Sequence, residues 1–271
     1  MSSQRTPAAL DAWLHTRGTQ ASRALDQLCA QFAAHTTLLY WHTDLGAAIA
    51  EARRTQRPIL SLRLLGRLDE ELSCANSRFF RRLLYPEPRI NRVLRERFVL
   101  HWQSVRAVPK VTIELGDGRK IVRTLTGNSL HLVLDPQGRP VDALPGLVSP
   151  DVFLGQLETA LALARVDRRM LAIQHQRLAM QPSPPSASPS RAMRASMMAM
   201  TKHVVEMPVL RAVSPVEADT QQNLQLHARI ADTFARGTAW TIDTLVAWIY
   251  RDLFLMPLED PFLGLDVADP V

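Results

Sequence analysis

One cysteine, Cys74, is the residue of this 271-residue chain whose type and position could best do chemistry. It lies in the run Ser73-Cys74-Ala75-Asn76-Ser77-Arg78, at the predicted start of a helix that follows the apolar run 58–65. The free backbone amides and the dipole of a helix N-terminus stabilise a thiolate, so Cys74 is a candidate nucleophile. Arg78, four residues on, is expected on the same helix face, where its charge would add to this stabilisation.

The chemistry open to Cys74 is limited by the residue that follows it at helical spacing. Disulfide reduction needs an attacking thiolate and normally a second thiol that resolves the mixed disulfide, but the chain has Ser77 three residues on. Cys74 and Ser77 are therefore candidate catalytic residues for glutathione-dependent exchange, trapping of a partner thiol or peroxide sensing, with Ser73, Asn76 and Arg78 in support. The alternative is an inert cysteine at a structural helix cap, since free cysteines are commonly buried.

The second cysteine and the histidines are weaker candidates. Cys29 lies on a helical apolar stripe and is expected in the core; it could resolve Cys74 only if the N-terminal helices dock beside the Cys74 helix. His101 and His131 lie on predicted strands and could approach each other across a sheet. A metal site would need further ligands, and neither His-Glu-x-x-His nor paired-cysteine spacing occurs. We therefore expect no metal and no cofactor.

The first half of the chain predicts helices that alternate with buried strands. Asp44 and Ser73 are expected N-caps, while Pro58 and Pro86 end the helices that precede them. The predicted elements are two short helices within 8–36, a helix over 45–54, a strand over 59–64, a helix over 73–85, a helical turn over 89–96 and a strand over 98–105.

After Pro109 the pattern changes to β alternation. Gly116-Asp117-Gly118 is a hairpin turn signal between strands expected over 111–115 and 120–125. A second hairpin is expected from strands over 130–134 and 140–144. Ser149-Pro150-Asp151 combines an N-cap, a proline at the first helical position and an acid, and it predicts a helix that runs to about residue 180.

The last third of the chain is set apart by composition. Residues 181–218 are rich in proline, serine and methionine and are predicted to form a linker. Residues 219–271 are expected to form a helical tail with an apolar stripe that ends in the strap Pro261-Phe262-Leu263-Gly264-Leu265. The polar face of the tail is mixed in charge, which favours docking on its own domain or on a partner protein over a membrane surface.

The overall composition is that of an ordinary globular protein, with 46% hydrophobic residues, 21% charged residues and a formal net charge of +6. The arginines are scattered among acids, so we expect no nucleic-acid partner. No run of 18 apolar residues predicts a membrane span, and the first residues lack a secretory signal. The expected location is the cytoplasm.

The order of strand, Cys-bearing helix, strand, β-hairpin and closing helix resembles the thioredoxin-like proteins, with a Cys-x-x-Ser motif at Cys74. The lead-in Arg57-Pro58-Ile59-Leu60 and the hairpin Asp135-Pro136-Gln137-Gly138-Arg139-Pro140 carry the resemblance, which covers roughly residues 41–165. Gly66-Arg67-Leu68-Asp69 with Ser73-Cys74 is also similar to the redox region of selenoprotein N, with Ala75 at the selenocysteine position.

The resemblance implies an α/β fold: a thioredoxin-like sandwich with a mixed β-sheet over 41–180, an N-terminal helical extension over 1–40 and the C-terminal helical tail. Three features depart from the family. Ser77 replaces the resolving cysteine, Asn128 and Ser129 precede a strand where thioredoxins have a cis-proline, and the hairpin 111–125 takes the place of a helix.

The residues around Cys74 and the family resemblance lead to the same functional expectation. In such a fold Asn76, Ser77, Asn128 and Ser129 would form a polar peptide-binding surface around Cys74. The sequence thus predicts a monothiol redox or thiol-exchange protein acting on protein thiols or glutathione. The alternative is a non-catalytic thioredoxin-fold interaction module that binds a protein partner through this surface and the C-terminal tail.

Overall fold

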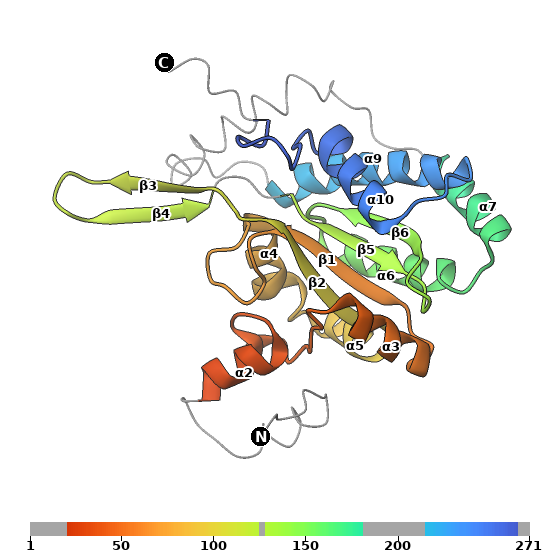
Figure 1. Cartoon of the computed structure of the whole chain (residues 1–271), viewed down its shortest axis with the longest axis horizontal. Helices are drawn as coiled ribbons and strands as arrows, with labels where there is room; N and C mark the ends of the chain where they lie inside the picture. Colours follow the sequence, from red (N-terminus) through yellow and green to blue (C-terminus); the bar gives the residue numbers. More distant parts are fainter. Residues whose placement is uncertain (1–20, 125–127, 181–214, 265–271) are drawn as a thin grey trace.

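A computed structural model describes residues 21–124, 128–180 and 215–264 of the chain. Its centre is a four-stranded mixed sheet in the order β2-β1-β5-β6 (Figure 1). β1 is parallel to β2 and antiparallel to β5, and β5 is antiparallel to β6. The fold is therefore mixed α/β, as predicted. The strands are β1 (Ile59–Leu65), β2 (Val99–Arg106), β5 (Leu130–Leu134) and β6 (Pro140–Pro145).

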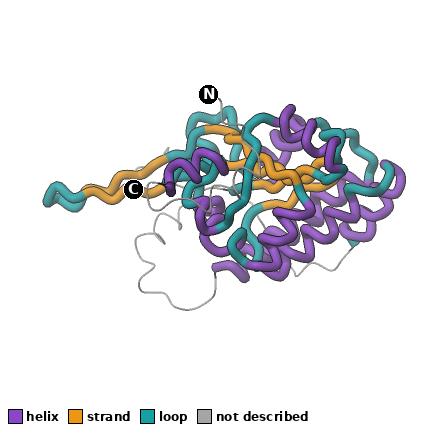
Figure 2. The backbone as a smooth tube through the Cα atoms, turned by 90° about the horizontal axis from the view of Figure 1, so that it is seen from below, coloured by secondary structure: helices purple, strands orange, loops and turns teal. Residues whose placement is uncertain are grey.

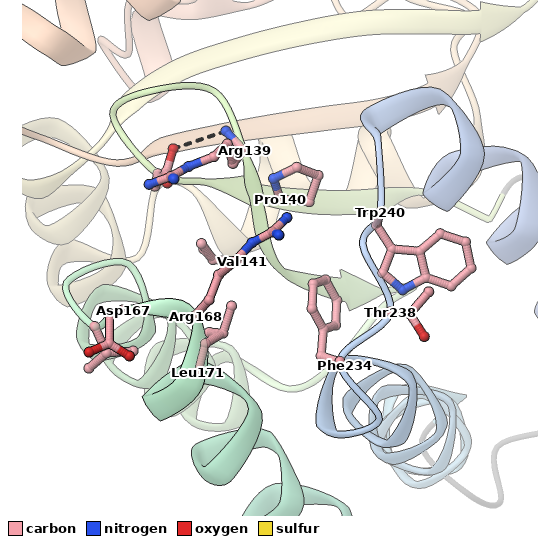
Figure 3. A pocket seen from close by; sticks show the side chains of 12 residues that line it. Arg139, Pro140, Val141, Asp167, Arg168, Leu171, Phe234, Thr238 and Trp240 are labelled. Atoms are coloured by element: carbon pink, nitrogen blue, oxygen red, sulfur yellow. Dashed lines mark hydrogen bonds and ion pairs between the residues drawn. The ribbon is translucent and has the colours of Figure 1, made fainter.

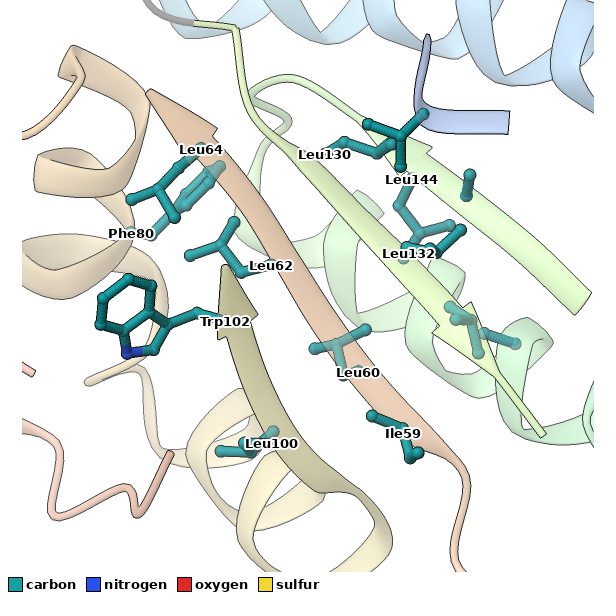
Figure 4. Packing of buried hydrophobic residues seen from close by; sticks show 14 of the residues in the cluster. Ile59, Leu60, Leu62, Leu64, Phe80, Leu100, Trp102, Leu130, Leu132 and Leu144 are labelled. Carbon is teal, nitrogen blue, oxygen red and sulfur yellow. The ribbon is translucent and has the colours of Figure 1, made fainter. Parts of the chain in front are cut away.

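The apolar run that predicts β1 is buried along its whole length, as expected for a central strand with both faces covered. Alternation places Leu60, Leu62 and Leu64 on one face of the sheet and Ser61 and Arg63 on the other. Figure 4 shows the leucines of β1 gathered along the sheet with buried side chains from β2 and β5 and with Phe80. The register of β5 places Leu130 and Leu132 on the opposite face of the sheet, beside Arg63 and Ser61, so the main core extends over both faces.

Helices cover both faces of the sheet. α4 (Ala75–Phe79), the wide π-type turn η2 (Phe80–Leu84), α5 (Pro88–Arg97) and α6 (Pro150–Leu163) lie behind it in Figure 1. On this face Phe80 and Phe153 pack their rings against His131. In front lies α3 (Leu45–Thr55), which contacts β1 and β2 and begins after Asp44, whose carboxylate caps the helix as predicted.

The helix expected from residue 150 to 180 is two helices, so that prediction was wrong. α6 ends at Leu163, and α7 (Arg168–Ala179) begins after Asp167, whose carboxylate accepts a hydrogen bond from the Met170 amide. A polar N-cap side chain competes with continued helix by satisfying a free amide, which explains why the chain turns here. The break allows α7 to pack against α9 instead of extending away from the sheet.

The C-terminal helices are packed on the body of the protein. They are α9 (Pro215–Ala235), α10 (Ile242–Trp248) and the π-type turn η3 (Ile249–Leu253). α9 contacts β6, and Asn223 of α9 donates a 2.7 Å hydrogen bond to the carbonyl of Leu147, just after that strand. The guanidinium of Arg106, on β2, donates to the carbonyls of Leu258 and Asp260. The tail therefore docks on its own domain, one of the two arrangements expected.

The N-terminal extension is described from residue 21 and contains α2 (Ala21–Cys29) and a 3-10 turn, η1 (Ala34–Thr36). The first of the two helices predicted within 8–36, which was expected to end near Gly18, lies outside the described residues. The Asp26 carboxylate accepts from the amides of Ala33 and Ala34 and fixes the loop that follows α2. The Trp102 indole donates to the carbonyl of Ala30, which ties this loop to β2.

The predicted first hairpin forms a separate two-stranded sheet of β3 (Lys110–Glu114) and β4 (Lys120–Thr124). It projects from the body as a narrow arm, which both Figure 1 and Figure 2 show plainly. The return strand was expected to end at Leu125, which lies outside the described residues. Because the arm is not part of the main sheet, both of its strand edges are free of partners among the described elements.

Candidate functional site

Cys74 lies at the junction of the loop after β1 and the start of α4, the position predicted for it. It is the N-cap residue, and its Sγ accepts a 3.4 Å hydrogen bond from the Ser77 amide. The Ser129 hydroxyl, at the start of β5, lies 3.1 Å from the same sulfur. The thiol has no exposed surface and belongs to the main core cluster. Two polar contacts therefore hold Cys74 in a closed interior site.

Ser73 and Ser77 form a second polar layer beside the cysteine. The Ser77 hydroxyl lies 2.7 Å from the Ser73 hydroxyl and 2.9 Å from the carbonyl of Cys74. Both serines are fully buried. The expectation that Ser73 is the N-cap was wrong by one residue. The Cys74 sulfur takes that role, which frees the Ser73 hydroxyl for the contact with Ser77 and for one with an arginine.

That arginine is Arg81, which the sequence did not single out. Its buried guanidinium donates to the carbonyls of Leu68 and Glu70 at 2.9 and 2.8 Å, to the carbonyl of Glu71, and to the Ser73 hydroxyl at 3.0 Å. Burial lowers the pKa of Arg81 to about 10. These hydrogen bonds fix the loop that leads into Cys74, so Arg81 is the main positioning residue of the site.

Arg78, expected to support the thiolate, lies half-buried on α4. Burial lowers its pKa, against the opposing effect of nearby Cys74. Its guanidinium donates a 3.2 Å hydrogen bond to the Thr124 hydroxyl, which itself donates to the carbonyl of Ser73. Arg78 thus connects the base of the β3–β4 hairpin to the site through Thr124.

The C-terminal tail closes the site from the side of η3. The hydroxyl of Tyr250 lies 3.2 Å from the carbonyls of both Arg63 and Asn128, and the side chain is fully buried. Burial, and after it the nearby Cys74, raises the pKa of Tyr250 well above its usual value, so the phenol stays neutral. A tail residue therefore contacts the loop before β5, beside the cysteine.

The four residues expected to form a polar peptide-binding surface are not equally accessible. Ser77 and Ser129 are buried, while Asn76 and Asn128 are half-buried. The carbonyl of Asn128, which could pair with an extended peptide, is taken by Tyr250. The structure brings Ser77 and Ser129 together around Cys74, and the role of the group in peptide binding stays a prediction.

His101 and His131 do not approach each other, because neighbouring register positions place them on opposite faces of the sheet. His101 pairs with Ser61, whose hydroxyl lies 2.7 Å from its Nδ1, and His131 pairs with Leu62. The Tyr85 hydroxyl lies 2.7 Å from Nε2 of His131. Burial lowers the pKa of each histidine to about 3, with Arg63 also acting on His101. Both are neutral core residues.

Cys29 packs with Leu25 and Ala34 in a small cluster separate from the main core, and both cysteines are free thiols. Burial, and after it the Asp26 carboxylate, raises the pKa of Cys29 to about 12. A thiol with this pKa is protonated at neutral pH and is a poor resolving nucleophile.

The described ranges hold no group of three His, Cys, Asp or Glu side chains placed to bind a metal ion. None of the helices in these ranges is long and apolar enough to cross a bilayer. The fold and the site together define a mixed α/β protein with a closed cysteine at a strand-to-helix junction. The sequence matches no protein-family model, and a search of curated proteins finds no significant relative.

Proposed function

We propose that this chain is a thioredoxin-like, non-catalytic protein-interaction module. The sheet order β2-β1-β5-β6 supports this fold assignment, as do the Cys-bearing helix between the two parallel strands and the closing helix α6 after the hairpin of β5 and β6. The place of Cys74, at the start of the helix after the first strand, agrees with the same family pattern.

The observation that carries the non-catalytic assignment is the complete burial of Cys74. Thiol exchange requires a disulfide sulfur to reach the attacking sulfur along the line of the bond that breaks. Here Ser129 contacts Sγ and the tail residue Tyr250 lies against the adjoining loop. Ser77 supplies a hydroxyl in the position of a resolving thiol, and a hydroxyl cannot complete the exchange.

The partner-binding element we assign is the β3–β4 hairpin, since the other two candidate surfaces are already occupied. The apolar stripe of the tail, including Leu245 and Ile249, is buried in the protein's own core, and the cysteine surface is closed. The hairpin instead projects from the body, and Leu115 at its tip is 48% exposed. An isolated two-stranded hairpin is marginally stable in water, so a third strand would stabilise it.

The chemistry of the hairpin indicates an acidic, extended partner segment. Glu114 forms an ion pair with Lys120 across the two strands. Lys110 and Arg123, nearer the base of the arm, have no acidic partner among the described residues. Lys110 and Arg123 face opposite sides of the hairpin, because Lys110 pairs with Thr124 and Arg123 with Val111. A segment that alternates acidic and apolar side chains would pair its backbone with a free strand edge and place its carboxylates on the face of one of these two cations.

The first test measures the chemistry of Cys74. We expect wild-type protein and Cys74→Ser to be equally inactive in a glutathione-dependent disulfide exchange assay. In the folded protein, iodoacetamide should alkylate Cys74 at least 100-fold more slowly than in protein unfolded in urea. Activity above background that Cys74→Ser abolishes would overturn the non-catalytic assignment.

The second test measures binding at the hairpin. A fluorescent ten-residue peptide of alternating valine and glutamate is titrated with wild-type protein and with the double variant Lys110→Gln, Arg123→Gln. The variant should bind at least 10-fold more weakly. The matched control, Arg92→Gln with Arg95→Gln, removes two exposed arginines from α5 and should bind as wild type does. Equal binding of a valine–lysine peptide would refute this mode.

A further inference from the structure

A cavity of about 410 Å³ lies where the C-terminal tail meets the body, remote in sequence from Cys74 (Figure 3). Three structural units form it: the turn from β5 into β6, the start of α7, and the end of α9 with the loop to α10. Its volume is within the usual range for sites that bind small organic molecules. The lining residues used below are Arg139, Val141, Asp167, Arg168, Leu171, Phe234 and Trp240.

One side of the cavity is apolar and held in place by further contacts. The Phe234 ring stacks on His175 with ring centres 4.7 Å apart, and Nε2 of His175 lies 2.8 Å from the carbonyl of Val141. The Trp240 indole stacks on Trp248 at 5.3 Å. The Trp240 N–H donates to the Thr233 hydroxyl, which leaves the cavity the carbon surface of the indole. These aromatic walls are therefore preformed.

The charged groups of the cavity differ in whether they are already engaged. The Arg139 guanidinium donates a 2.7 Å hydrogen bond to the Asp135 carboxylate. The Asp167 carboxylate caps α7 through the Met170 amide. Arg168 is exposed, and within the described part of the chain it has neither an ion pair nor a side-chain hydrogen bond. Figure 3 shows its side chain extending across the cavity toward Val141 and Pro140.

We propose that this cavity binds a small aromatic carboxylate. The flat ring would pack against Phe234 and Trp240, and the carboxylate would meet the guanidinium of Arg168, whose planar fork matches it with two parallel N–H donors. The Asp167 carboxylate, bound to the Met170 amide, offsets the positive potential at the start of α7, so the attraction for the carboxylate comes from Arg168. An arginine at the edge of an apolar cavity favours a ligand that joins an anionic group to an apolar ring.

The test uses 3-phenylpropionate as probe and its neutral amide, 3-phenylpropanamide, as the matched compound. Binding is followed on the full chain through the indole N–H signal of Trp240 in ¹H–¹⁵N NMR spectra, assigned with Trp240→Phe. The acid should shift this signal saturably and bind at least 10-fold more tightly than the amide. Arg168→Gln should remove that preference, while Arg169→Gln, an exposed neighbour outside the cavity, should keep it.

A second variant, Leu171→Phe, narrows the cavity without altering charge and should weaken both compounds. The proposal is overturned if the acid causes no saturable shift up to 10 mM, if acid and amide bind equally, or if Arg168→Gln retains the preference of wild type. Circular dichroism of each variant establishes that the fold is kept, because Arg168 is exposed and its loss removes no buried contact.

Discussion

The Tyr250 hydroxyl gives the sharpest test of whether the C-terminal tail covers Cys74. It lies 3.2 Å from the carbonyls of Arg63 and Asn128, which belong to β1 and to the loop before β5. One hydroxyl has one proton, so the two carbonyls share a single donor. Tyr250→Phe deletes that donor and keeps the ring, which leaves no large cavity in the packing around Phe254.

The expected magnitude follows from this geometry. A net hydrogen bond contributes about 1 kcal/mol, and leaving buried acceptors without a donor adds part of their desolvation cost. We therefore expect Tyr250→Phe to lower the free energy of unfolding by about 1–2 kcal/mol. If the same contact holds the tail closed, the population of the tail-open state should rise by a factor of about 5–30.

The assay is alkylation of the native protein by iodoacetamide, followed by peptide mass spectrometry that separates Cys74 from Cys29. When reclosing is faster than labelling, the rate at Cys74 follows the population of the open state. The Cys74 rate should therefore rise by about 5–30-fold in Tyr250→Phe. Tyr85→Phe is the matched control, because it deletes an equally buried hydroxyl that contacts His131 within the body.

The two variants should differ in the labelling rate of Cys74. Both should lose similar stability in urea, but only Tyr250→Phe should accelerate Cys74 labelling under native conditions. An unchanged Cys74 rate in Tyr250→Phe, together with the expected loss of stability, would show that the thiol is covered by something other than the tail. Equal acceleration in Tyr85→Phe would show that labelling requires opening of the body itself.

Two further predictions concern buried charges. Burial opposes charge on His227, but the Asp142 carboxylate, 3.0 Å away, outweighs it and raises the pKa of the histidine. The pair's stabilisation should thus be complete below the unfolded histidine pKa of about 6.5 and be lost as pH rises through the pKa of the folded protein. In urea unfolding from pH 5.5 to 8.5, the free energy of unfolding should fall less steeply with pH in His227→Gln than in wild type. Arg81→Met removes the charged donor from three loop carbonyls and should lower the free energy of unfolding in urea by about 3 kcal/mol. Arg81→Lys should restore only part of this stability. A loss below about 0.5 kcal/mol in Arg81→Met would contradict the positioning role of Arg81.

Local patterns were sufficient to predict most of the sheet. The strands over 59–64 and 130–134 and the hairpin with its Gly116-Asp117-Gly118 turn follow from apolar runs, alternation and turn residues, which act within a few positions. The Asp44 cap follows from equally local chemistry. Elements specified by neighbours in sequence can be derived from sequence.

The closure of the site depends on contacts that no local pattern contains. Tyr250 meets the Asn128 carbonyl from 122 residues away, and Asn223 packs against Gly146 from the far side of the linker. Arg81 could have been suspected only as one arginine among many, since its role depends on loop carbonyls that become buried after folding. The sequence therefore indicates where Cys74 lies, but tertiary packing decides whether anything can reach it.

The docked tail has opposite effects at Cys74 and at the aromatic cavity, so the proposals for these two sites can be tested separately. At Cys74 it fills space: η3 brings Tyr250 against the loop before β5, next to Ser129, whose hydroxyl contacts the Cys74 sulfur. At the other end it creates space, because Phe234 and Trp240 supply the aromatic walls of a cavity whose cation Arg168, without an acidic partner among the described residues, belongs to α7. A ligand in that cavity would contact the tail and the body together and bind only the docked arrangement. By linkage it would stabilise docking, so saturating 3-phenylpropionate should slow Cys74 alkylation in Tyr250→Phe toward the wild-type rate. Slower alkylation that persists in Arg168→Gln would break this connection and leave the cavity and the closed cysteine as independent features.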